Sequence, residues 1–106
     1  MSKKTTIAVI SRSLPEYNAI KAALGQGGVD LRRVEKFSTA GDVLAHSFSF
    51  RIALIIVGGS EREAVLANRA YAMLTKKRIP CYFLTGPESK TVEEIIGEGR
   101  CELAPA

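Results

Sequence analysis

The chain has 106 residues, of which 46% are hydrophobic and 25% are charged, and this size and balance are typical of one globular domain. The net charge of +4 comes from 15 Lys and Arg residues against 11 Asp and Glu residues. The basic residues fall in three separate places along the chain, which favours solvated surface patches, so we expect no direct binding of nucleic acid. No apolar run approaches the ~20 residues of a membrane span, so we expect no membrane association.

The two cysteines, Cys81 and Cys101, form neither a CxxC pair nor a cluster with histidine. This spacing predicts no metal site, and nothing else in the sequence predicts a cofactor. Both cysteines lie in apolar runs, where free thiols in a reducing compartment are the usual state. Because the first ten residues also lack the features of a signal peptide, we expect a cytoplasmic protein.

The first part of the chain predicts a strand followed by a helix. Residues 5–10 are β-branched and apolar, which is typical of a buried strand. Ser13 with Glu16 three residues later forms a capping box, which predicts that a helix begins there. The glycine-rich segment 25–28 is expected to end this helix.

A second strand, a short helix and a third strand are predicted next. Residues 30–37 have poor apolar alternation and predict a strand at the edge of a sheet. Ser38 is expected to cap a short helix that extends to Ala45. Residues 52–57, with the sequence IALIIV, form the most apolar stretch of the chain. A continuous apolar run of this length is typical of a central strand that is covered on both faces.

A long helix is predicted after the third strand. Ser60 and Glu63 form a second capping box, and the helix is expected to run to about Lys77. Its spacing predicts that four residues face inward: Leu66, Ala70, Met73 and Leu74. Asn68 and Arg69 are expected to be solvated.

The last third of the chain repeats the alternation of strand and helix. Residues 81–84 predict a fourth strand, Thr91 opens a short helix, and the glycines at 97 and 99 close it. Residues 101–103 predict a short fifth strand. Alternating units of this length predict a parallel sheet with helices on both faces, in a single domain over residues 1–106.

The order and spacing of these elements resemble the receiver domain of bacterial response regulators. The clearest matches are the segments 39–44, 53–57, 79–86 and 97–105. The resemblance implies a doubly wound, flavodoxin-like α/β fold whose five-stranded parallel sheet has the order 2-1-3-4-5. The family's last helix is missing after Pro105, so the chain is either the first domain of a longer protein or has this face covered by something else.

The resemblance also implies where a phosphoryl-accepting pocket would lie, at the carboxyl ends of the strands. Only the threonine after the fourth strand agrees with the family, and the degenerate pocket consists of Ser11, Arg12, Gly58, Gly59, Thr85 and Ala104. An acidic pair is replaced by Ser11 and Arg12, the acceptor aspartate by Gly58 or Gly59, and the lysine by Ala104. We therefore expect no bound metal, no phosphorylation at this site and no enzymatic activity.

Two functions remain open from the sequence. The first is a phosphorylation-independent pseudo-receiver, a protein–protein module in bacterial transcriptional or two-component regulation. It would bind a partner protein, or a second copy, through the fourth helix, the fifth strand and the face of the missing helix. The alternative is a sensor that binds an anionic small molecule or nucleotide on Ser11, Arg12, Gly59 and Thr85. If these residues have no binding role, Arg12 simply pairs with a nearby acid and the glycines only form a turn.

An enzyme is the third and least supported reading. A phosphocarrier of the α/β type would need a cysteine directly after the first strand, where Ser11 stands. His46, the only histidine, has no evident nucleophile to activate and is expected on a surface loop.

Overall fold

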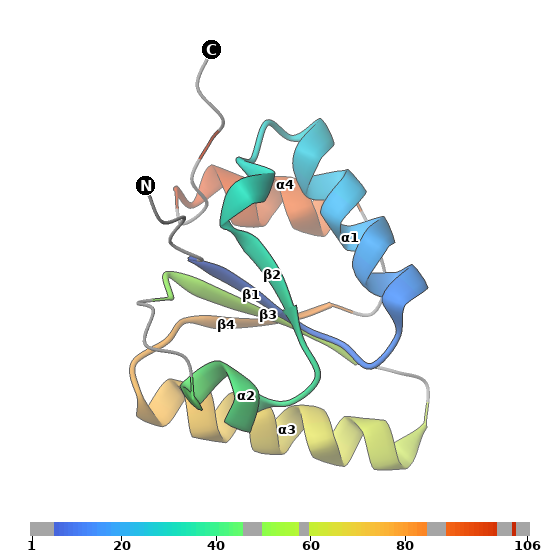
Figure 1. Cartoon of the computed structure of the whole chain (residues 1–106), viewed down its shortest axis with the longest axis vertical. Helices are drawn as coiled ribbons and strands as arrows, with labels where there is room; N and C mark the ends of the chain where they lie inside the picture. Colours follow the sequence, from blue (N-terminus) through green and yellow to red (C-terminus); the bar gives the residue numbers. More distant parts are fainter. Residues whose placement is uncertain (1–5, 46–49, 58–59, 85–88, 100–102, 104–106) are drawn as a thin grey trace.

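The computed structural model describes residues 6–45, 50–57, 60–84, 89–99 and 103, and these residues form an α/β fold with a parallel sheet (Figure 1). Four strands pair in parallel in the order β2-β1-β3-β4. The strands are β1 (Ile7–Ile10), β2 (Val34–Phe37), β3 (Ile52–Ile56) and β4 (Cys81–Leu84). The helices are α1 (Leu14–Gln26), α2 (Ala40–Ala45), α3 (Glu61–Lys76) and α4 (Ser89–Gly97), with a short 3-10 helix, η1 (Leu31–Arg33), before β2.

The sheet lies between two layers of helices, α1 and α4 on one face and α2 and α3 on the other (Figure 1). Side chains alternate between the faces along a strand, so β1 sends Ile7 and Val9 toward α1 and Ala8 and Ile10 toward α3. All four are buried, as expected for a strand covered on both sides. The central strands β1 and β3 thus supply both halves of the core.

The N-caps of both predicted capping boxes are confirmed, whereas the Ser13 N–H donates to the Ser11 hydroxyl and not to Glu16. The Ser13 hydroxyl accepts a hydrogen bond from the Glu16 N–H at 3.4 Å, and the Ser60 hydroxyl accepts one from the Glu63 N–H at 3.2 Å. The predicted cap of α2 was wrong by one residue. Thr39, not Ser38, accepts the hydrogen bond from the helix at 3.2 Å, because α2 begins at Ala40 and the residue directly before a helix is its cap.

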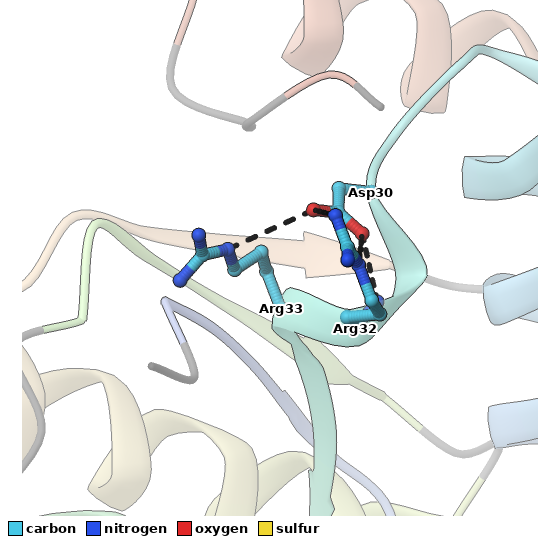
Figure 2. Close-up of polar contacts among 3 residues, drawn as sticks. All are labelled: Asp30, Arg32 and Arg33. Carbon is cyan, nitrogen blue, oxygen red and sulfur yellow. Dashed lines mark hydrogen bonds and ion pairs between the residues drawn. The ribbon is translucent and has the colours of Figure 1, made fainter. Parts of the chain in front are cut away.

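The strand predicted over residues 30–37 begins only at Val34, because Asp30 starts a turn of 3-10 helix instead. Figure 2 shows the buried Asp30 carboxylate between the side chains of Arg32 and Arg33. It accepts hydrogen bonds from the Arg32 backbone N–H at 3.1 Å and from the Arg32 guanidinium at 3.0 and 3.1 Å, and Arg33 Nε lies 3.7 Å away. The hydrogen bonds and positive charge from Arg32 lower the pKa of Asp30.

The expected fifth strand beside β4 is not found, and the described residues form a four-stranded sheet instead. Leu103 makes an isolated antiparallel bridge to Val29, while residues 101 and 102 lie outside the described residues. A fifth strand on the outer side of β4 would lie in the same direction from β4 as β4 lies from β3. The connection from β3 to β4 is right-handed with α3 on one face, so a right-handed connection to a fifth strand would place α4 on that same face. Because α4 lies on the α1 face, it covers the area that a missing last helix was expected to leave open.

No helix in the part of the chain that the structure describes is long and apolar enough to cross a membrane.

Candidate ligand-binding site

A cavity of about 370 Å³ lies at the carboxyl ends of β1 and β3, between α2 and α3. The chain leaves β1 toward β2 on one side and leaves β3 toward β4 on the other, so this is the point where the strand order reverses. Ile10 and Ile55 are neighbours in the parallel register and line the cavity with their buried side chains. The two residues form an apolar floor beneath the helices.

The long helix α3 supplies one wall of the cavity. Its lining residues recur at helical spacing and include Leu66, Ala70 and Met73. Of the residues predicted to face inward, Ala70 and Leu74 are buried as expected, but the prediction for Met73 was wrong, because it is 44% exposed. Successive helical residues point about 100° apart, so Met73 lies beside the core and next to the cavity.

Four charged side chains line the same cavity: Arg12 after β1, Glu16 in α1, and Glu63 and Arg69 in α3. All four are exposed, and none forms an ion pair with another residue that the structure describes. The sequence had left open that Arg12 pairs with a nearby acid, and no such partner is found within the described ranges. The cavity therefore combines an apolar floor with charges of both signs.

Ser11 has a different role from the one that the sequence suggested. Its hydroxyl accepts a hydrogen bond from the Ser13 N–H at 3.0 Å and donates one to the Ser13 carbonyl at 3.1 Å. Its backbone N–H donates to the Phe37 carbonyl at 2.9 Å, which extends the β1–β2 pairing by one residue. Ser11 is buried and closes the turn between β1 and α1, so it positions Arg12 and has little free hydrogen-bonding capacity.

Of the six residues that the sequence singled out, the structure brings Ser11 and Arg12 to one cavity. Gly58, Gly59, Thr85 and Ala104, like His46, lie outside the described residues. Arg69 is exposed, as the sequence predicted, but its place at the cavity was not predicted, and neither was that of Met73. The signal was the spacing of Leu66, Arg69 and Met73 on one side of α3.

Two further observations concern metal and thiol chemistry. Within the described ranges, no group of three or more His, Cys, Asp or Glu side chains is placed to hold a metal ion. Cys81 lies on β4, away from the cavity, and its thiol is 3.2 Å from the Ile79 carbonyl. Burial raises the pKa of Cys81 to about 11, so this side chain is a neutral thiol at neutral pH.

Comparison with known proteins supports the fold alone. No family model matches the sequence, and no curated protein matches it. A de novo designed Rossmann fold protein is similar in structure, with a TM-score of 0.51 and 12% sequence identity over 92% of this chain and 97% of that one. A second design of the same description has a TM-score of 0.49 and 10% identity, over 90% of this chain and 96% of that one. The first similarity identifies the chain as having a Rossmann-like α/β fold.

Proposed function

We propose that this chain is a binding module without enzymatic activity, which takes a small anionic molecule in the cavity bordered by β1, β3, α2 and α3. The cavity is the observation that carries the proposal. Its volume of about 370 Å³ falls within the roughly 300–1,000 Å³ of small-molecule sites. Doubly wound sheets bind their ligands at this switch point, which supports the same location.

The charges at the cavity favour one anionic group attached to an apolar body. Arg12 and Arg69 offer planar guanidinium groups that suit a carboxylate or phosphate. Glu16 and Glu63 line the same cavity and offset the two positive charges, which disfavours a ligand with several negative charges. The apolar floor formed by Ile10 and Ile55 suits the uncharged part of the molecule.

Binding without turnover fits the hydroxyl groups that follow β1. A nucleophilic hydroxyl needs a neighbouring base that removes its proton. The Ser11 hydroxyl instead donates to a backbone carbonyl, and the Ser13 hydroxyl accepts the capping hydrogen bond of α1. Both groups therefore hold the turn in place, and we assign them no catalytic role.

An NMR amide titration tests the proposal with three probes: inorganic phosphate, phenyl phosphate and AMP. We expect saturable shifts for phenyl phosphate and AMP at residues 11–13, at Ala40 and along residues 66–73. Arg12→Ala should weaken binding by roughly tenfold or more, because it removes a charge-assisted contact. The matched control is Arg62→Ala, which removes an exposed arginine of α3 outside the cavity lining and should leave the affinity unchanged.

Two results would overturn this assignment. The first is that neither organic probe shifts these amides at millimolar concentration, which would leave the cavity without an anionic ligand of this kind. The second is that Arg62→Ala weakens binding as much as Arg12→Ala does, which would show general attraction to a basic surface. Shifts with inorganic phosphate that match those of phenyl phosphate would contradict the role of the apolar floor.

A second candidate is the phosphorylation-independent pseudo-receiver in bacterial transcriptional or two-component regulation, located in the cytoplasm. The strand order 2-1-3-4 favours it, because the first four strands of a receiver sheet have this order, and Arg12 stands where the family has an acid. Titration with magnesium and beryllofluoride, a mimic of phosphorylated aspartate, tests it. Saturable shifts around Ser11 and Arg12 would contradict a dead acceptor site, and no shifts would direct the search to protein partners.

A further inference from the structure

The two outer strands of the sheet differ in charge. β2 carries Glu35 and Lys36 at its centre, and charged side chains on an edge strand discourage pairing with another chain. β4 reads Cys81-Tyr82-Phe83-Leu84 and has no charged residue. Among the described residues, only β3 pairs with β4. Within the residues that the structure describes, the outer side of β4 is therefore a short apolar edge that no charged side chain of β4 and no further strand protects.

The hydrogen-bonding groups that point outward from β4 follow from its pairing with β3. The Ala53 N–H donates to the Pro80 carbonyl and the Val57 N–H donates to the Leu84 carbonyl, both at 2.8 Å. Because the groups of a strand alternate in direction, the N–H and C=O of Cys81 and Phe83 point away from β3. The edge thus presents two donors and two acceptors in the plane of the sheet.

We propose that this edge binds a second copy of the same chain, with the two β4 strands antiparallel about a two-fold axis at Tyr82. In this register Cys81 of each copy lies opposite Phe83 of the other, and each pair exchanges both of its backbone hydrogen bonds. The edge complements itself, because it offers equal numbers of donors and acceptors and opposes no like charges. The two sheets then form one continuous sheet.

An exposed aromatic pair extends the interface on the α3 face. Phe83 stacks on Tyr71 of α3, with 5.1 Å between ring centroids and 23° between ring planes. Phe83 is 39% exposed and Tyr71 is 40% exposed. The two-fold axis is perpendicular to the sheet, so the aromatic pairs of both copies lie on the same face of it and flank the new ladder.

The small size of this surface favours a weak dimer. An aromatic side chain has roughly 200 Å² of surface, so about 80 Å² of each ring is available for burial. Two rings from each copy then contribute about 320 Å², and even with the strand edges the interface falls below the ~1,200 Å² of a stable complex. The dimer is accordingly weak, with a dissociation constant of roughly 0.1–1 mM.

Sedimentation equilibrium of the full chain tests the proposal from about 10 μM to about 1 mM, the range in which so small an interface associates. The mass should rise from that of a monomer toward that of a dimer. Phe83→Lys places like charges on the shared edge and should weaken association by roughly tenfold or more. The control Val65→Lys replaces a residue that is 49% exposed on α3 and lies about 240° around the helix from Tyr71, so it should leave association unchanged. Thermal melts check that both variants fold.

A disulfide cross-link tests the register. In a chain with both native cysteines replaced, Tyr82→Cys places two thiols opposite each other, where Cα atoms lie about 4.5 Å apart and a disulfide fits. Mild oxidation should give a covalent dimer, while Val65→Cys should not. A chain that stays monomeric at about 1 mM overturns the proposal. This holds even if the edge is found to bind a different protein. A dimer that resists Phe83→Lys and is not cross-linked through Tyr82→Cys also overturns it.

Discussion

The end of α3 contains a residue in a conformation that its side chain disfavours. Arg78 has a φ of 63°, in the left-handed region. The Ile79 N–H donates to the Leu74 carbonyl at 3.0 Å and the Arg78 N–H donates to the Thr75 carbonyl at 2.9 Å, which together define a Schellman motif. The motif directs Ile79 back onto the core beside Leu74. Glycine is the residue that normally occupies the Arg78 position.

Replacing Arg78 with glycine should therefore stabilise the protein. The left-handed conformation costs a non-glycine residue about 1–2 kcal/mol. Glycine removes this cost but gives the unfolded chain more freedom, which takes back about 0.4–1 kcal/mol. The Arg78 side chain is exposed and has no hydrogen bond or ion pair with the described residues, so little is lost with it. The free energy of unfolding should rise by about 0.5–1 kcal/mol, or about 2–6 °C in Tm.

Urea unfolding, followed by circular dichroism, measures this change against two controls. Lys77→Gly replaces the preceding residue, whose φ of −93° gives glycine no advantage, and should destabilise by about 0.5–1 kcal/mol. Gly28→Ala tests the reverse substitution at the end of α1, where Gly28 has a φ of 88° in the same motif and an added Cβ would meet no atom within 4 Å. It should also destabilise, by about 1 kcal/mol. If Arg78→Gly destabilises as much as Lys77→Gly, the backbone of Arg78 is not strained and the reasoning is wrong.

Three further predictions follow from local chemistry. Asp30→Asn should destabilise the protein at pH 7, and in urea unfolding its difference from the wild type should shrink as the pH falls below about 5. The reason is that the pKa of Asp30 is lower in the folded state than its unfolded-state value of about 4, so the carboxylate contributes stability above that pH and loses this contribution in acid. In a Cys101→Ser variant, Cys81 should react with iodoacetamide at pH 8 far more slowly than a free thiol, because its pKa of about 11 leaves little thiolate. A rate equal to that of a free thiol would show that Cys81 is not buried. Gly41→Ala should raise the free energy of unfolding by about 0.5 kcal/mol and therefore raise Tm slightly, because alanine favours the helix and the new Cβ would have only Thr39 Oγ1 nearby, at 3.6 Å. A lower Tm would show that the added methyl group clashes.

The elements that the sequence predicted best are those specified by local chemistry. Ser13 and Ser60 each stand three residues before a glutamate, and the N-cap that each serine forms needs no information from the rest of the chain. The bounds of β4 agree with the prediction because Pro80 precedes it and apolar residues fill it. The predicted end of α3, at about Lys77, agrees with the observed end at Lys76 to within one residue, although the sequence gives no glycine signal for the left-handed conformation of Arg78.

The candidate site was half predictable, for a geometric reason. Residues that directly follow a buried strand lie at the carboxyl edge of a parallel sheet, and the resemblance to a receiver singled out Ser11 and Arg12 at this edge. The contribution of Arg69 and Met73 depends on how α3 is rotated against the sheet. Apolar spacing is compatible with several rotations that differ by a fraction of a turn, and only the packing of Leu74 against the other helix-facing core residues selects one.

The largest error was the prediction of a fifth strand beside β4. It arose because the sequence pattern does not show on which face of the sheet α4 packs. The spacing of strand, helix and strand is the same whether α4 crosses on the α1 face or the α3 face. Val92 and Ile95 are buried in the core cluster of α1, so packing commits α4 to that face. A right-handed connection from this face leads back across the sheet, away from the outer side of β4. The cavity between α2 and α3 does not involve α4, so the candidate site does not depend on the predicted fifth strand. The outer side of β4, in contrast, is unpaired among the described residues because that strand is not found there.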